Sequence, residues 1–179
     1  MRILPTALLA ATAACLALAG PAAAQPLPSP IQVPAGNTLF KVNYAVGVQI
    51  YSCNATTTGG HAWTFVAPRA NLYNRRGRHT MIHFAGPTWQ HRDGSSVVGA
   101  VVANTPGAPG AIPHLLLRAA KTEPGKFGDK LVKTTFIQRL ETSGGLAPAA
   151  GTCNAKTVGR QAGVPYTAYY AFWKASRKA

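Results

Sequence analysis

Two histidines and one aspartate in the middle of the chain are the first candidates for chemistry. His91 and Asp93 stand two positions apart, so on one extended strand both side chains project from the same face. A carboxylate in that position can orient an imidazole for acid–base catalysis or for metal binding. With His83, this pattern is what a hydrolytic or metal-assisted enzyme would need. The alternative is that Asp93 only forms the Asp93-Gly94 turn and that the histidines are surface or hydrogen-bonded core residues.

Aromatic side chains are the second set of candidates, because exposed Trp and Tyr on a sheet can stack on sugar rings or bases. Trp89 is the best of them. It lies between a Gly86-Pro87 break and the Asp93-Gly94 turn, and loops of this kind often carry function. Core packing is the alternative for every member of the set, which comprises Tyr51, Trp63, Tyr73, Trp89, Tyr169 and Trp173.

Positive charge is the clearest physical signal. The chain has 18 Lys and Arg against 4 Asp and Glu, a formal net charge of +14. Arg75, Arg76 and Arg78 form the densest group, which we expect on a hairpin loop, and Arg139 is a further candidate for ligand binding. Such a charge favours an acidic polysaccharide, lipopolysaccharide or another polyanion as partner. The alternative is a basic surface that only keeps the protein soluble. No nucleic-acid recognition module is present, so we do not expect specific nucleic-acid recognition.

The first 24 residues have the features of a secretion signal. Met1-Arg2 is a short basic start, residues 3–19 are apolar but too short for a convincing membrane span, and Ala22-Ala23-Ala24 suits the cleavage rule. We therefore expect a secreted or periplasmic protein, cleaved near Ala24, with no transmembrane span in its mature form. The alternative is a retained membrane anchor.

The remaining chain is long enough for one domain. Residues 25–36 contain four prolines and should be an extended lead-in. Residues 37–174 should form a single β domain, and residues 175–179 a basic tail.

Export also decides how the cysteines are interpreted. Cys15 leaves with the signal, so Cys53 and Cys153 remain in an oxidising compartment and are expected to form a disulfide. Two free buried thiols are the alternative. We expect no metal site, because neither cysteine has a close Cys or His partner in the sequence.

Alternating apolar and polar residues predict about eight short strands and no helix of ten or more residues. The fold class is therefore all-β, as a β-sandwich or a closed barrel with long Gly/Pro-rich loops. Neither a G-x-G-x-x-G sequence nor a P-loop is present, so no cofactor is expected, and the common hydrolase motifs are also missing. The expected strands cover residues 38–44, 46–53, 63–66, 80–85, 97–102, 115–120, 131–140 and 166–173.

Several motifs, in order from Val33 to Trp173, resemble an uncharacterised family of exported proteins, the domain of unknown function 3455. The central pair is Phe84-Ala85-Gly86-Pro87-Thr88-Trp89 followed by Asp93-Gly94-Ser95. The others are Val33-Pro34-Ala35-Gly36, Ile112-Pro113 with Leu115-Leu116-Leu117, Ile137-Gln138-Arg139-Leu140 with Gly144-Gly145, Cys153, and Val164-Pro165-Tyr166.

This resemblance implies export and a common fold, but no established activity. Some fungal relatives carry a malate dehydrogenase label, which the missing dinucleotide fingerprint argues against here. The sequence departs from the family pattern at His114, where Trp is expected, and at Gln90 and Tyr169, where acids are expected. Any catalytic role of those acids would be lost in this chain.

We therefore expect an exported small β domain that binds a polyanionic or glycan partner in the cell envelope without catalysis. One alternative is an enzyme that uses His83, His91 and Asp93. A second alternative is a structural or stress-related envelope protein.

Overall fold

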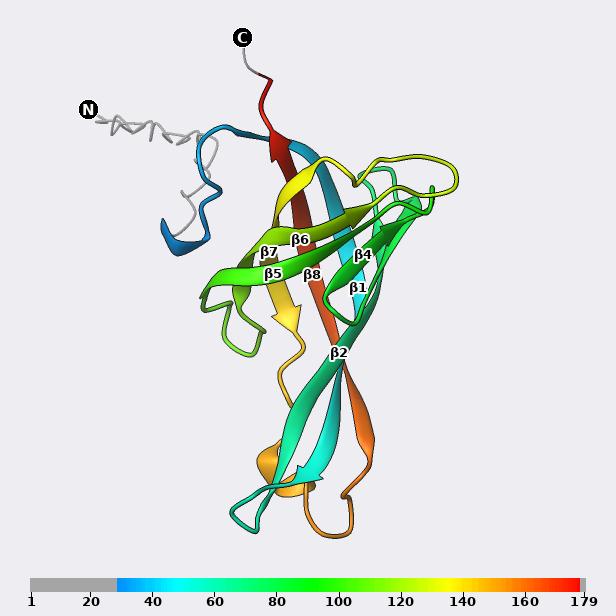
Figure 1. The fold of residues 1–179 in the computed structure, drawn as a ribbon. Coiled ribbons are helices and arrows are strands. Elements are labelled where there is room, and N and C mark those ends of the chain that lie inside the picture. Colours follow the sequence, from blue (N-terminus) through cyan, green and yellow to red (C-terminus); the bar gives the residue numbers. More distant parts are fainter. Residues whose placement is uncertain (1–28, 178–179) are drawn as a thin grey trace, which may run out of the picture.

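The computed structural model describes residues 29–177, which form one closed antiparallel barrel (Figure 1). Each strand pairs with the next along the chain, and the last pairs with the first. The all-β class predicted from the alternation is thus confirmed. The total of eight strands also agrees, although two of the expected strands are one and β4 was not among those expected. The strands are β1 (Asn37–Ala55), β2 (His61–Tyr73), β3 (His79–Phe84), β4 (Thr88–His91), β5 (Ser96–Thr105), β6 (His114–Glu123), β7 (Thr134–Gly144) and β8 (Gln161–Ala175).

Two boundary predictions near the start of the domain are wrong. The strands expected at 38–44 and 46–53 are one strand, β1, because Ala45 is buried and continues the inward-facing row. Pro68 does not end a strand but lies inside β2, opposite Gln49. The pairing of β1 with β2 shifts register immediately afterwards, between Ile50 and Tyr51, and proline in a sheet is tolerated at such irregular positions.

The three longest strands give the molecule its shape. β1, β2 and β8 run along the barrel and continue below it as a twisted extension, which the other five strands do not reach (Figure 1). The segment containing the short 3-10 helix η2 (Ala150–Thr152) lies beside the end of this extension.

The predicted disulfide closes that end of the molecule. Cys53 on β1 and Cys153 just after η2 are bonded, with a separation of 100 positions in sequence and 5.3 Å between their Cα atoms. Both cysteines are buried. The bond therefore holds the η2 segment against the three-stranded extension, as expected from the two cysteines that remain after residue 24.

The core lies inside the barrel. Tyr166, Ala168, Tyr170 and Phe172 all point inward from β8, as their spacing of two predicts. Trp89 packs edge-on against Tyr170 and Phe172, with ring centroids 5.2 and 6.1 Å away. These contacts make the aromatic residues of β8 the centre of the core.

Strand β5 is less buried than its sequence suggests. The run from Val97 to Val102 is apolar throughout, which predicts a strand covered on both faces. Val97 is fully buried, but Val101 and Val102 are 53% and 52% exposed. The pairing of β5 with β6 shifts register twice, after Val98 and after Val101, so the regular alternation of faces is broken where these two valines lie.

The expected signal segment, 1–24, lies outside the described residues, as do residues 25–28 of the lead-in. The described part of the lead-in is not uniformly extended, because Ser29–Ile31 forms the 3-10 helix η1. Ile31 is fully buried, and its carbonyl accepts a hydrogen bond of 2.7 Å from Gln138 Nε2 on β7. This segment therefore packs on the barrel before β1 begins.

Candidate functional site

The predicted basic loop is the turn between β2 and β3, residues 74–78. Asn74 fixes its shape, because the Asn74 side-chain oxygen accepts hydrogen bonds from the backbone N–H groups of Arg76 and Arg78, at 2.9 and 3.1 Å. Gly77 supplies the positive φ angle, 70°, that the turn requires. The turn follows directly on strand β2, which includes residues 71–73. The turn is short and internally bonded, so it presents its arginines from a defined backbone.

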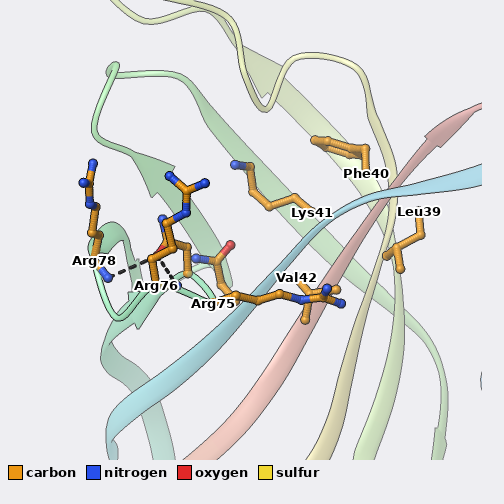
Figure 2. Close-up of a pocket in the computed structure, with 9 residues that line it drawn as sticks. Leu39, Phe40, Lys41, Val42, Arg75, Arg76 and Arg78 are labelled. Atoms are coloured by element: carbon orange, nitrogen blue, oxygen red, sulfur yellow. Dashed lines mark hydrogen bonds between the residues drawn. The ribbon is translucent and has the colours of Figure 1, made fainter.

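Arg75, Arg76 and Arg78 are exposed and border a hollow of about 460 Å³ between the turn and the start of β1. We call it the basic hollow; the polar residues that line it are Lys41, Asn43, Asn74, Arg75, Arg76 and Arg78. Figure 2 shows Lys41, Arg76 and Arg78 on one side of strand β1, while the side chain of Arg75 crosses β1 and ends beside Val42. Four cationic side chains thus surround one concave surface.

No Asp or Glu side chain of the described residues lines the basic hollow. Burial lowers the pKa of Lys41, and the positive charge of Lys130 lowers it further, against a smaller opposing effect of Asp93. Within residues 29–177, the acidic side chains with a basic partner within 4 Å are Glu123, beside Lys121, and Asp93, beside His91. The charge of the basic hollow is therefore not neutralised by the protein itself.

An apolar groove of about 880 Å³ adjoins the basic hollow and shares Leu39, Val42, Asn74 and Arg75 with it. We call it the aromatic groove, since its rings come from Tyr44, Tyr73, Tyr169 and Trp173. Tyr44 and Tyr169 are 37% and 39% exposed, and their ring centroids lie 5.0 Å apart. They meet because β1 and β8 pair with these two residues in direct register. Glu141 also borders this groove.

Trp89 lies in the core and does not form the exposed surface expected of a stacking platform, because only 1% of its surface is accessible. It stacks on His83, with ring centroids 4.2 Å apart and the planes within 7° of parallel. The two residues face each other in the register of β3 and β4. Exposed stacking surface is found instead at Tyr44 and Tyr169.

His83 is a buried, neutral imidazole. Burial lowers its pKa to about 3, and the positive charge of Arg139 acts in the same direction. Its Nδ1 lies 2.8 Å from the carbonyl oxygen of Thr88, so Nδ1 carries the proton and donates it. Nε2 is then left with a lone pair that can accept a hydrogen bond.

His91 and Asp93 do meet, as predicted, but as part of a turn. His91 Nδ1 lies 3.1 Å from Asp93 Oδ1 and 3.2 Å from the Asp93 backbone nitrogen. The carboxylate of Asp93 also accepts hydrogen bonds from Ser95 and from the backbone of Lys130. Burial lowers the pKa of His91. The oxygens of the Asp93 carboxylate are thus occupied by hydrogen bonds that hold this turn and the Lys130 backbone together.

His83 does not share a cleft with His91 and Asp93. His83 lines a cavity toward Tyr51 and Arg139, whereas His91 lines a separate hollow with His79 and Arg92. The enzyme hypothesis requires these three side chains in one cleft, whereas His83 and His91 line different hollows.

Arg139 is separated from the other three arginines. It lies opposite Tyr170 and Leu115 on the neighbouring strands, and its Nε donates a hydrogen bond of 3.0 Å to the carbonyl of Pro113. It lines a cavity of about 370 Å³, which we call the inner cavity, together with Gln49, His83, Trp89 and Tyr170. Its surroundings are therefore those of the barrel interior.

Lys41, Asn43 and Tyr44 border these surfaces although sequence reasoning treated them only as strand residues. Asn43 is 2% exposed; its Nδ2 donates a hydrogen bond of 2.7 Å to Thr80, while its Oδ1 is buried without a partner. The pairing of Tyr44 with Tyr73 and with Tyr169 brings this part of β1 beside the basic turn. Local alternation does not reveal which strands pair, so no signal in the sequence showed that these residues lie at the site.

Among the described residues, no group of three or more His, Cys, Asp and Glu side chains is arranged to hold a metal ion. Within residues 29–177, no helix has the length and hydropathy that crossing a membrane requires. Residues 34–174 match the family described as "Protein of unknown function (DUF3455)". No curated protein and no solved structure shows a significant match.

Proposed function

Since the chain belongs to the DUF3455 family of proteins of unknown function, we propose its function from its own surface. It is an exported domain that binds an acidic polysaccharide of the cell envelope and does not catalyse a reaction on it. The ligand lies across the basic hollow and the aromatic groove.

The observation that carries this proposal is the concentration of unpaired cations around one hollow. Arg75, Arg76, Arg78 and Lys41 border it, and no acidic side chain of the described residues lines it. Positive charge collected in a concave surface attracts polyanions and raises their rate of association. Arginine also pairs with carboxylates in a bidentate geometry, which suits the uronic acid groups of acidic glycans.

Two further features suit a glycan. Asn43 Oδ1, in the wall of the basic hollow, is a buried acceptor without a partner, and a sugar hydroxyl can donate to it. The exposed rings of Tyr44 and Tyr169 lie in the adjoining groove, where a sugar ring can stack on them. A polymer with hydroxyls, flat apolar faces and carboxylates therefore suits both parts of the surface.

Export is part of the same proposal. The sequence of residues 1–24 supports it, and so does the disulfide between Cys53 and Cys153, since such bonds persist in oxidising compartments.

The test measures binding of the protein that begins at Gln25 to alginate oligosaccharide, dextran oligosaccharide and duplex DNA, each over a series of salt concentrations. We expect alginate to bind and neutral dextran not to bind. Alginate binding should weaken with salt less steeply than DNA binding, since stacking and hydroxyl contacts are not screened. Changing Tyr44 and Tyr169 together to alanine should remove this difference. Equal affinity and equal salt dependence for alginate and DNA would show that charge alone is responsible.

A further inference from the structure

The inner cavity is a second concave site, separate from the basic hollow and the aromatic groove. Its mouth is apolar, since Phe65, Val66 and Val101 line it and are each about half exposed. Toward the barrel interior it is lined by Gln49, His83, Trp89 and Tyr170, which are all at most 3% exposed. A volume of about 370 Å³ lies in the range of pockets that bind small molecules.

Two residues that line this cavity each carry a buried side-chain donor without a partner. Gln49 Nε2 and Trp89 Nε1 are buried donors without an acceptor. Unpaired buried donors cost free energy, and in native proteins they are few. On the acceptor side, His83 uses Nδ1 for Thr88 and keeps the lone pair of Nε2. The residues of the cavity wall thus carry two unpaired donors and one free acceptor.

Arg139 adds a positive charge to the same cavity. It is half-buried, its Nε bonds to a backbone carbonyl, and within residues 29–177 it forms no ion pair with an acidic side chain. Its positive charge reaches two residues of the interior wall, since it exerts a lowering effect on the pKa of His83 and on that of Tyr170. A half-buried guanidinium of this kind favours an anionic ligand, and a carboxylate above all.

The walls of the inner cavity favour a ligand with an aromatic ring. Tyr51 and Phe65 meet edge to face, with ring centroids 5.7 Å apart, and both line the cavity. His83 and Tyr170 meet in a similar way at 5.1 Å. Rings prefer such offset and edge-on neighbours, so a ligand ring can extend this arrangement.

We propose that the inner cavity binds a small aromatic carboxylic acid that carries a hydroxyl group. Its carboxylate pairs with Arg139 and accepts from Gln49, its hydroxyl donates to His83 Nε2, and its ring lies between the aromatic walls. This site does not depend on the polysaccharide surface, because the two share no lining residue among those described.

The experiment uses 4-hydroxycinnamate and 4-hydroxybenzoate as probes, with titration calorimetry and quenching of Trp fluorescence as the readouts. The amides of both acids replace the carboxylate by a neutral group of similar shape, and cinnamate and benzoate lack the hydroxyl. We expect saturable binding of at least one hydroxy acid with a Kd below about 1 mM. Its amide should bind about 10- to 100-fold more weakly, since the lost hydrogen bonds are charge-assisted.

The variant Arg139→Gln should weaken binding of the acid by a similar factor without changing binding of the amide. Arg118→Gln is the matched control, since it removes the same charge from an exposed position of β6 outside the cavity. The proposal is overturned if neither hydroxy acid binds saturably, if the amides bind as well as the acids, or if Arg139→Gln binds the acid as the wild type does. If Arg139→Gln does not fold, the proposal is tested by comparing the affinity of the wild type for each acid with its affinity for the corresponding amide.

Discussion

The carboxylate of Asp93 holds the turn after β4 to the segment that leads into β7, and its removal should destabilise the barrel strongly. Oδ1 accepts hydrogen bonds of 2.6 Å from Ser95 Oγ and 2.9 Å from Ser95 N, and Oδ2 accepts one of 3.1 Å from Lys130 N. The change Asp93→Ala leaves these three donors without their acceptor. Hydrogen bonds to charged groups contribute about 1.5–3 kcal/mol each, but bonds that share one carboxylate do not add fully. We therefore expect the free energy of unfolding to fall by about 3–5 kcal/mol.

Denaturation in urea, followed by circular dichroism, measures this change. Asp129→Ala is the matched control, because Asp129 is exposed in the same segment and its removal alters the net charge equally. Surface substitutions of this kind change stability by about 0.5 kcal/mol or less. Equal effects of the two variants would refute the reasoning, since the loss would then follow from charge and not from the buried hydrogen bonds.

The pH dependence gives a second readout of the same carboxylate. Burial alone would raise the pKa of Asp93, but hydrogen bonds from Ser95, Lys130 and His91 outweigh it and hold the pKa below the usual range. A carboxyl whose pKa is lower in the folded state stabilises the fold fully above its unfolded pKa of about 4. The difference between wild type and Asp93→Ala should therefore narrow as the pH falls below about 4. If the difference in free energy of unfolding between wild type and Asp93→Ala stays constant below about pH 4, the pKa of Asp93 is not lowered by these hydrogen bonds.

Three further perturbations test other parts of the structure. Changing Cys53 and Cys153 together to serine should lower the free energy of unfolding by about 4–5 kcal/mol, because the bond closes a loop of 100 residues; equal denaturation midpoints would contradict this. Because burial holds the pKa of His83 at about 3, stability should fall by up to about 1.4 kcal/mol per pH unit from about pH 6.5 toward 3. His83→Gln should flatten this dependence of the free energy of unfolding on pH, which urea denaturation at several pH values measures. A variant with the slope of the wild type would refute the prediction. A Cβ at Gly47 would lie 2.2 Å from a backbone oxygen of β2, so Gly47→Ala should lower the free energy of unfolding by about 1–3 kcal/mol. Gly151→Ala, where a Cβ meets nothing within 4 Å, should leave the melting temperature unchanged.

The sequence predicts the fold class and the disulfide because both depend on signals that are strong in one dimension. The period of two along β8 places Tyr166, Ala168, Tyr170 and Phe172 on one face, and the barrel buries that face. Only two cysteines remain after the predicted signal segment, and in an oxidising compartment two cysteines are expected to pair with each other. The turn at Asp93-Gly94 is equally local, and it does join β4 to β5.

The composition of the site could not be predicted in the same way, because it depends on strand register. Alternation assigns Tyr44 to a face of β1, but it does not say that β8 brings Tyr169 beside it. Lys41 and the basic turn lie more than 30 positions apart in sequence and meet only because β1 and β2 pair along their length. For Trp89, the loop signals on both sides suggested exposure, whereas its ring is large enough to fill the core. Local sequence does not decide between these outcomes.

The central claim is that the cations of the basic hollow, and not the net charge alone, bind an acidic polysaccharide. The most direct test compares two triple variants with the same charge change. One replaces Arg75, Arg76 and Arg78 by glutamine, and the control replaces the exposed residues Arg118, Lys156 and Arg160 in the same way. We expect the first variant to lose affinity for alginate oligosaccharide by at least about tenfold, and the control by less than about threefold. Equal losses in the two variants would contradict the claim.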